Sequence, residues 1–380
     1  ATPVAPLASA ISSTVITAAI FDSFLYLGTG VDGLIVVDLE SRSIRQITQG
    51  PDDIDLPSDT ITALLADEDG VWIGTPNGLV YTEDSGRTFQ HYTAFSSGLP
   101  SNWIVGLYKS SDGSYWVGTR EGLAQGARTQ FDSFNTTNAR LSHNHINAIH
   151  QDQAGNLWVG TQDGLNRLAP GATQFDWFNS VNTPNLGSDQ VMSLTSQNDL
   201  LWVGTFDEGL YRMDTSSGEM LQVALDPDNP FALQAPGVTS LLAHSSGNIV
   251  ATTFGGGTAV VDSSGRVVRV IRSALDEYVN DFPITMAEDD SGSILIGMSQ
   301  SLGIINPALD DISTVLLNNA PLGAKLGAGT TIIELYESIG AGDNIGLAMY
   351  EGGHKDTQPL RVAAFHWFER HLKGKSIDEE

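Results

Sequence analysis

Two histidines one residue apart, His143 and His145, have the spacing that most directly suggests metal chemistry. Residues i and i+2 of a strand point to the same side, so both imidazoles would face one way, with Asp163 as a neighbouring carboxylate. Such a set could hold a divalent cation, the one cofactor that the sequence suggests, and activate water for hydrolysis. However, SHNHI (142–146) stands where related segments read PSNWI and PSDTI. Two histidines without a fixed third ligand are therefore interpreted first as polar loop residues, with a metal pair as the alternative.

A wider set of polar and aromatic residues recurs along the chain in two groups. One group precedes apolar runs, and it comprises Asp59, Asn102, Trp103, His143, Asn144, His145, Asp189 and Gln190. The other follows W-x-G-T-like steps, and it comprises Asp32, Asn77, Arg120, Glu121, Gln162, Asp163, Phe206, Asp207, Glu208 and Phe254. Aromatic planes, carboxylates and amides suit a neutral or cationic ligand, with Arg120 available for one acidic group. At any single position the alternative is that Asp, Asn or Ser satisfies turn amides.

A sequence repeat must position these residues. Its reference point is the glycine of the W-x-G-T-like step, which recurs at intervals of 42 to 48 residues: Gly28, Gly74, Gly118, Gly160, Gly204, then Thr252 in the same slot, then Gly297. A period of about 40–50 residues with strand-like content is typical of a β-propeller. The sequence therefore predicts an all-β fold with seven blades over residues 14–318.

Each repeat is predicted to form four strands. In one copy, Ile146–Asp152 alternates like a half-buried strand, and LWVGT, GLNRLAP and TQFDWFN follow as the second, third and outer strands. Tryptophan recurs in the second strand at Trp72, Trp116, Trp158 and Trp202. We interpret these indoles as wedges between neighbouring sheets rather than as sugar-stacking platforms.

The repeats resemble those of the two-component regulator propellers. The similar segments are DEDGVWIGTPNGL, SSDGSYWVGTREGL, DQAGNLWVGTQDGL and SQNDLLWVGTFDEGL, joined by the linkers LPSDTI, LPSNWI, LSHNHI and LGSDQV. The resemblance implies the extracytoplasmic, ligand-sensing part of a bacterial signalling protein, in the periplasm or outside the cell. It also implies that both groups of loop residues emerge on one face of the ring. There we expect a small molecule or a saccharide to bind.

The segment Thr82–Phe89 (TEDSGRTF) is similar to the Asp-box of other propellers. Its Asp84 is expected to accept hydrogen bonds from turn amides, and Gly86 to permit the turn. That motif is structural, so it implies no catalysis.

The composition narrows the classes of partner. The chain of 380 residues has 45 acidic and 18 basic residues, a formal net charge of −27, and no cysteine. Nucleic acid and anionic membranes are therefore poor partners, and disulfides, thiolate metal sites and cysteine nucleophiles are excluded. No apolar run approaches the ~20 residues that span a bilayer. Residues 1–13 form an N-terminal extension without the features of a signal peptide.

Residues 319–380 depart from the repeat. Residues 330–374 could form a decayed eighth blade, but PLRVAAFHWFERHLKG has a helical pattern. This segment resembles the C-terminal end of an esterase-like α/β-hydrolase, in which His354 would match the triad histidine. No G-x-S-x-G nucleophile motif accompanies it. The favoured hypothesis is a binding module; the alternatives are a hydrolase of esters, lactones or phosphoesters, which would use His354 or a channel metal, and a protein-binding scaffold.

Overall fold

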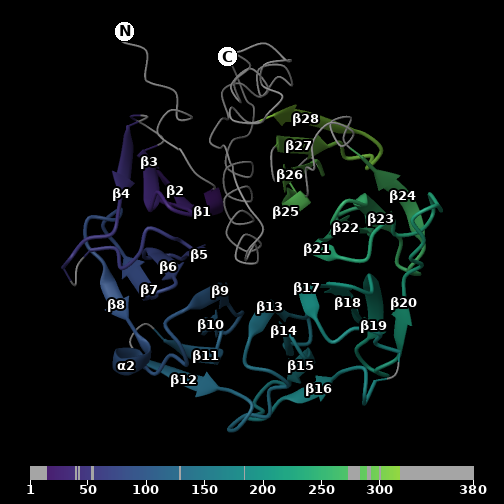
Figure 1. Cartoon of the computed structure of the whole chain (residues 1–380), viewed down its shortest axis with the longest axis horizontal. Helices are drawn as coiled ribbons and strands as arrows, with labels where there is room; N and C mark the ends of the chain where they lie inside the picture. Colours follow the sequence, from purple (N-terminus) through teal and green to yellow (C-terminus); the bar gives the residue numbers. More distant parts are fainter. Residues whose placement is uncertain are drawn as a thin grey trace.

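The computed structural model describes residues 15–316, apart from 39–40, 42, 53–54, 128–129, 184, 273–282, 289–291 and 299–300. This part of the chain forms seven four-stranded antiparallel sheets and a single short helix, α2 (Ala94–Ser97). In Figure 1 the sheets follow one another around a central axis, as blades of a propeller do. The predicted all-β propeller is therefore confirmed. Among these residues no helix has the length and apolar character needed to cross a membrane.

Each sheet consists of four strands that are consecutive along the chain. The first four sheets are β1 (Val15–Phe21), β2 (Phe24–Thr29), β3 (Leu34–Asp38), β4 (Ile44–Ile47); β5 (Ala63–Ala66), β6 (Val71–Thr75), β7 (Gly78–Thr82), β8 (Gln90–Tyr92); β9 (Ile104–Lys109), β10 (Tyr115–Thr119), β11 (Gly122–Ala127), β12 (Gln130–Phe134); β13 (Ile146–Gln151), β14 (Leu157–Thr161), β15 (Gly164–Leu168), β16 (Asp176–Phe178). The last three are β17 (Val191–Gln197), β18 (Leu200–Thr205), β19 (Leu210–Asp214), β20 (Met220–Gln222); β21 (Val238–Ala243), β22 (Ile249–Thr253), β23 (Gly257–Val261), β24 (Val267–Ile271); β25 (Pro283–Glu288), β26 (Ile294–Met298), β27 (Ser301–Ile305), β28 (Ile312–Leu316).

The first strand of each sheet lies nearest the axis (Figure 1). These inner strands contact one another in chain order, from β1 and β5 through to β21 and β25. The described sheets begin at Val15 and end at Leu316, close to the predicted limits of the repeat. The predicted extension 1–13 and the segment 319–380, with its eighth-blade and hydrolase-like alternatives, lie outside the described residues.

The repeated glycine occupies one register position in every sheet. It lies in the second strand and pairs with a residue of the inner strand, which is the third residue of that strand in every sheet but the second, where it is the first: Thr17↔Gly28, Ala63↔Gly74, Gly106↔Gly118, Ala148↔Gly160, Ser193↔Gly204, Ser240↔Thr252 and Thr285↔Gly297. The predicted assignment of Thr252 to the glycine slot is therefore correct, although its side chain must be accommodated there.

The structure gives a physical reason for this glycine, because the next sheet packs directly against it. A Cβ built on the glycine would come unusually close to a β-branched residue at the start of the next inner strand or, for Ile61, two residues before it: Gly28 to Ile61 at 2.5 Å, Gly74 to Ile104 at 2.7 Å, Gly118 to Ile146 at 3.1 Å, Gly160 to Val191 at 2.6 Å and Gly204 to Val238 at 2.6 Å. Each glycine thus leaves a notch that a branched side chain of the neighbouring sheet fills.

The four repeated tryptophans are buried between sheets, as predicted. Trp72, Trp116, Trp158 and Trp202 are each at most 4% exposed. The ring of Trp72, for example, lies 5.1 Å from that of Tyr115 and 6.2 Å from that of Phe131, both of which belong to the next sheet. Stacked sheets therefore bury apolar faces that one sheet alone would leave in water.

The Asp-box forms the predicted turn between β7 and β8. Asp84 Oδ1 accepts hydrogen bonds from the N–H groups of Arg87 and Thr88, each at 2.9 Å, and Gly86 has a φ of 74°. Burial alone raises the pKa of Asp84, but hydrogen bonds from Thr88, Thr82 and Arg87 bring it below its ordinary value. The role of this motif is structural.

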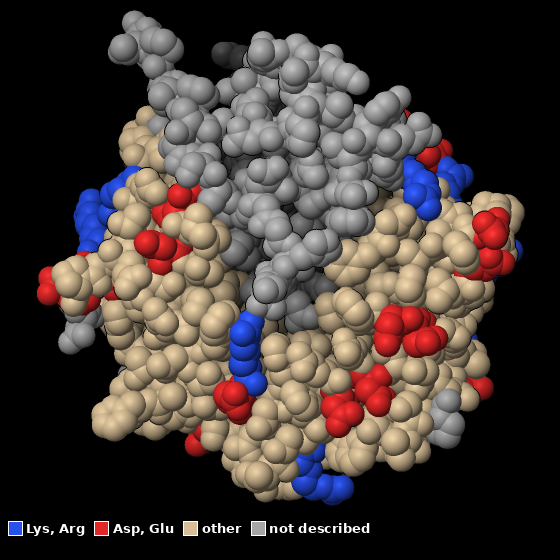
Figure 2. Space-filling view, in the orientation of Figure 1, with Lys and Arg blue, Asp and Glu red and all other residues tan. Residues whose placement is uncertain are grey.

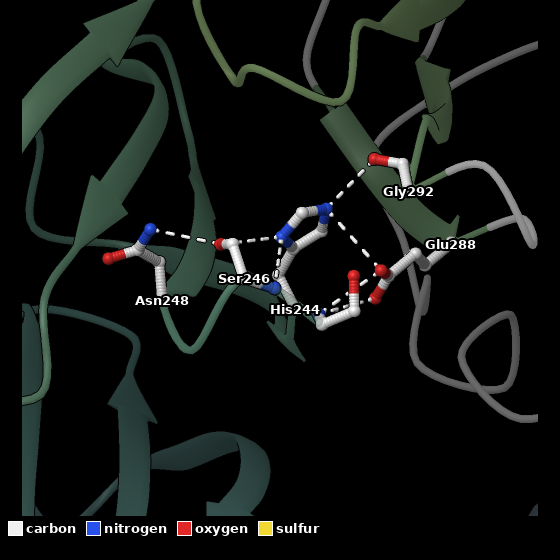
Figure 3. A network of polar contacts seen from close by, with 6 residues as sticks. His244, Ser246, Asn248, Glu288 and Gly292 are labelled. Carbon is white, nitrogen blue, oxygen red and sulfur yellow. Dashed lines mark hydrogen bonds and ion pairs between the residues drawn. The ribbon is translucent and has the colours of Figure 1, made fainter.

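A polar network that the sequence did not predict links the sixth and seventh sheets (Figure 3). His244, which is 3% exposed, accepts at Nδ1 from the N–H of Ser246 (3.1 Å), and its Nε2 lies 2.8 Å from Gly292 O. The carboxylate of Glu288 lies 3.4 Å from the same Nε2 and accepts from the N–H of Ser245. Asp67 and Asp152 occupy the equivalent turn in other sheets and bind turn amides in the same way. His244 is thus a turn-capping residue that also reaches the next sheet.

A candidate ligand-binding rim

The two predicted groups of loop residues lie side by side on one face of the ring. Backbone hydrogen bonds join the loop before an inner strand to the turn between the second and third strands of the same sheet. The donor N–H and acceptor C=O pairs are Arg120 to Trp103 (3.3 Å), Phe206 to Gln190 (3.0 Å) and Phe254 to Gly237 (2.9 Å). We call the face formed by these loops and turns the rim.

The threonine of each G-T step fixes the turn that reaches the rim. Its Oγ1 donates to the carbonyl of the glycine that begins the third strand, at 2.7 Å from Thr119 to Gly122. The same oxygen accepts from the N–H of the turn residue Glu121, at 3.1 Å. Equivalent pairs of bonds occur at Thr29, Thr75, Thr161 and Thr205. The buried threonine therefore holds the turn backbone, while the turn side chains project from it.

Four Asp or Asn residues of the rim hold the loop backbone. Each accepts a hydrogen bond from an N–H eight to ten residues earlier: Asp59 from Gln49 (2.6 Å), Asn102 from Ala94 (2.7 Å), Asn144 from Thr136 (2.9 Å) and Asp189 from Ser180 (2.6 Å). These bonds close the loop between consecutive sheets. For these four residues they favour the alternative to ligand binding, in which the side chain accepts hydrogen bonds from backbone N–H groups of the loop.

The two histidines of the rim contact neighbouring loop groups. Ser58, Ser101 and Ser188 each accept from the N–H two residues later, and His143 does the same through Nδ1, from the N–H of His145 at 2.9 Å. The Nδ1 of His145 lies 3.2 Å from Nε2 of Gln162. His143 thus takes the place of a capping serine. Over the described ranges no group of three or more His, Cys, Asp or Glu residues could hold a metal ion.

An arginine–tryptophan stack is the most distinctive feature of the rim. The Cζ of Arg120 lies 3.6 Å from the centroid of the Trp103 ring, so the guanidinium stacks on the indole. Both side chains are half-buried. A cation–π contact of this kind contributes about 0.5–2 kcal/mol, depending on how far it is desolvated. It limits the freedom of a long side chain and so prepares it for in-plane hydrogen bonds to an acidic group.

An aromatic pair lies on the rim two and three sheets further along the chain. The rings of Phe206 and Phe254 are 6.4 Å apart and inclined at 72°, and Phe206 is 48% exposed. Ser188 donates to the carboxylate of the adjacent Asp207. A Cβ at Gly237 would lie 2.7 Å from the Phe254 ring, so the glycine allows this ring its position. The pair offers apolar surface to a ligand.

The charged residues of the predicted rim are mostly acidic. They include Asp32, Glu121, Asp163, Asp207 and Glu208, of which all but Asp32 are exposed. Figure 2 shows acidic side chains spread over the face viewed along the axis, whereas basic side chains lie mainly toward its edge, with one group near the centre. Repulsion would oppose a highly charged anion here, while a neutral ligand, or one with a single acidic group at Arg120, would be accepted.

One polar contact of the inner strands was not singled out from the sequence. Nε2 of His150 on β13 lies 2.8 Å from Oγ of Ser196 on β17. Part of the imidazole remains accessible, but most of its surroundings are protein, and this burial lowers the pKa of His150 to about 4 although Asp152 opposes the shift. A histidine with so low a pKa is a poor general base near neutral pH. The pair is best described as an inter-sheet hydrogen bond.

The predicted catalytic alternative at His354 lies outside the described residues.

Comparison with known families places part of this rim in a recognised repeat. Residues 55–77, 98–121 and 140–163 match the model of the two component regulator propeller. Each matched segment runs from a loop before an inner strand to the turn between the second and third strands. These three segments thus match the family that the sequence predicted. No curated protein matches the sequence.

Solved structures share the fold at low sequence identity. The extracellular domain of BT4673 from B. thetaiotaomicron, described as a hybrid two component system, is 19% identical with a TM-score of 0.53, over 80% of this chain and 40% of that one. Virginiamycin B lyase from Staphylococcus aureus, solved with quinupristin, is 14% identical with a TM-score of 0.54, over 75% and 92%. The computationally designed Ika8 protein is 14% identical with a TM-score of 0.59, over 80% and 87%. Such likenesses show the fold alone, and this chain spans less than half of the BT4673 domain.

Proposed function

We propose that this chain is the sensing propeller of a bacterial signalling protein and that it binds a small molecule or a saccharide at the rim. Three of its repeats match the model of the two component regulator propeller. The similar BT4673 domain is described as extracellular, which supports a periplasmic or extracellular location for this chain. The observation that carries the proposal is the gathering of the Arg120–Trp103 stack and the Phe206–Phe254 pair on one face.

The rim suits recognition because the groups that hold its backbone differ from the side chains that it displays. The buried threonines, and the hydrogen bonds that the Asp and Asn side chains of the rim accept from loop N–H groups, fix the backbone of the turns and loops. The side chains that they display can then differ between sheets without disturbing the core. Arg120 offers in-plane donors to a carboxylate, and Phe206 offers an apolar face. A ligand with an apolar ring and one acidic or several neutral polar groups fits this combination.

A thermal-shift screen of neutral saccharides, sugar acids, amino acids and aromatic carboxylates tests the proposal. A ligand present at 100 times its Kd stabilises the fold by about 2.7 kcal/mol. Replacing Phe206 by Ala should reduce this stabilisation for any rim ligand, and replacing Arg120 by Ala should reduce it for acidic ligands. Arg266→Ala is the matched control, since Arg266 is exposed and pairs with Asp262 away from the rim. The proposal fails if millimolar ligands give no shift, or if the shifts persist in both rim variants.

A further inference from the structure

A groove at the perimeter of the ring is separate from the rim. It has a volume of about 550 Å³ and lies between the outer strands β16 and β20 of neighbouring sheets. Figure 1 shows these two strands at the outer edge of the ring. The volume is within the range of sites for small ligands, about 300–1,000 Å³. The residues that matter for its chemistry are Trp177, Asn182, Asn185, Ser217, Glu219 and Met220.

On each of the two edge strands beside the groove, one backbone carbonyl already accepts a hydrogen bond from a side chain. Nδ2 of Asn182 donates to the carbonyl of Trp177 on β16 at 2.9 Å. Nδ2 of Asn185 donates to the carbonyl of Met220 on β20 at 3.3 Å. Side-chain amides therefore already occupy edge acceptors that a β-strand of a peptide would need. This argues for a ligand that is recognised by other groups.

The remaining groups of the groove combine an aromatic ring with polar groups. Trp177 is half-buried and lines the groove, so part of this residue remains accessible. Ser217 and Glu219 lie in and after the turn between β19 and β20, and both are exposed. A pyranose ring needs such a pair of features, because it presents C–H groups on one face and hydroxyl groups around its edge. A carboxylate accepts hydrogen bonds from sugar hydroxyls more strongly than a neutral acceptor does.

The charge around the groove selects between classes of sugar. Glu219 lines the groove, and the chain as a whole carries a formal charge of −27. The Arg167 guanidinium, on the neighbouring β15, is paired with Asp176 at 2.7 Å. An anionic sugar would therefore meet repulsion that a neutral sugar avoids. We propose that the groove between β16 and β20 binds a neutral saccharide through stacking on Trp177 and hydrogen bonds to Glu219 and Ser217.

Calorimetric titration of the full chain with maltotriose, xylotriose and mannotriose tests this assignment, with trigalacturonic acid as the charged comparison. At least one neutral trisaccharide should bind, and the charged one should bind more weakly. Trp177→Ala should weaken binding at least about tenfold, whereas Trp177→Phe, which keeps an aromatic ring, should retain most of it. Should Trp177→Ala fold poorly, Ser217→Tyr fills the groove from an exposed turn and should have the same effect.

Variants of the rim separate this site from the proposed function. Trp103→Ala and Phe206→Ala should leave trisaccharide binding at the groove unchanged. Binding that survives both Trp177→Ala and Ser217→Tyr, or the absence of binding at millimolar trisaccharide, would overturn the inference. Loss of saccharide binding only in the rim variants would also overturn it, while supporting the rim. Thermal shifts by rim ligands that persist in Trp177→Ala would show that the rim functions independently of the groove.

Discussion

Substitution of Gly160 by Ala probes the packing that holds the ring together. An added Cβ would lie 2.6 Å from Cγ1 and 3.1 Å from Cβ of Val191, where ordinary contacts are 3.4–4 Å. Val191 is β-branched, fully buried and at the start of the next inner strand, so its χ1 cannot change without cost. The overlap of roughly 0.8 Å must instead move one sheet relative to the next. Overpacking of this kind costs about 1–3 kcal/mol.

Urea unfolding followed by circular dichroism measures this cost. Gly160→Ala should lower the unfolding midpoint, whereas Gly106→Ala is the matched control, since Gly106 lies in an inner strand and an added Cβ there meets nothing within 4 Å. Val191→Ala makes room for the new methyl group, so the double variant should recover part of the loss, with a coupling of about 0.5–3 kcal/mol. Equal midpoints for Gly160→Ala, Gly106→Ala and the parent chain would refute the idea that this glycine sets the distance between sheets.

Two further predictions concern buried polar groups. Trp158→Phe removes the 2.7 Å bond from Nε1 to Asp152 and should destabilise by about 2–4 kcal/mol, which urea unfolding can measure. Trp202→Phe should cost less, because among the described residues the Nε1 of Trp202 has no hydrogen-bond partner; equal costs would contradict the role of that bond. His150 has a folded pKa of about 4, below its ordinary value, so the unfolded chain takes up its proton first and stability falls as pH drops from about 6.5 to 4. The melting temperature should fall less across this window in His150→Gln than in the parent chain. If the melting temperatures of both chains fall equally, His150 does not have this lowered pKa.

Much of the fold could be predicted from the sequence because the same pattern of residues recurs in several copies. A glycine slot recurs every 42 to 48 residues, and in four of the seven repeats a tryptophan stands two residues before it. Such a repeat indicates a structural unit that packs against similar neighbours each time. The Gly160–Val191 contact shows what those surroundings are, a notch and a branched side chain of the next sheet. Even the exception could be placed: the register puts Thr252 in the glycine slot although its residue type differs.

The roles of individual rim residues were less predictable, because they depend on partners in the neighbouring loop. Asn102 and His143 resemble ligand-binding residues in type and position. Their contacts to Ala94 and His145 are instead hydrogen bonds that shape the loop. The alignment of SHNHI with PSNWI did indicate a loop-shaping role for His143, since a serine stands at the same position in the related segment. The perimeter groove had no sequence signal, because it forms only where Trp177 and the β19–β20 turn of another sheet meet.

The central claim is that ligand recognition occurs on the rim of a ring of stacked sheets. A crystal structure of the chain with the most stabilising ligand of the thermal-shift screen tests this claim most directly. The account predicts ligand density in contact with the Arg120–Trp103 stack or the Phe206–Phe254 pair, above inner strands that lie around one axis. Density for that ligand only on the opposite face of the ring, or sheets not arranged around an axis, would contradict it.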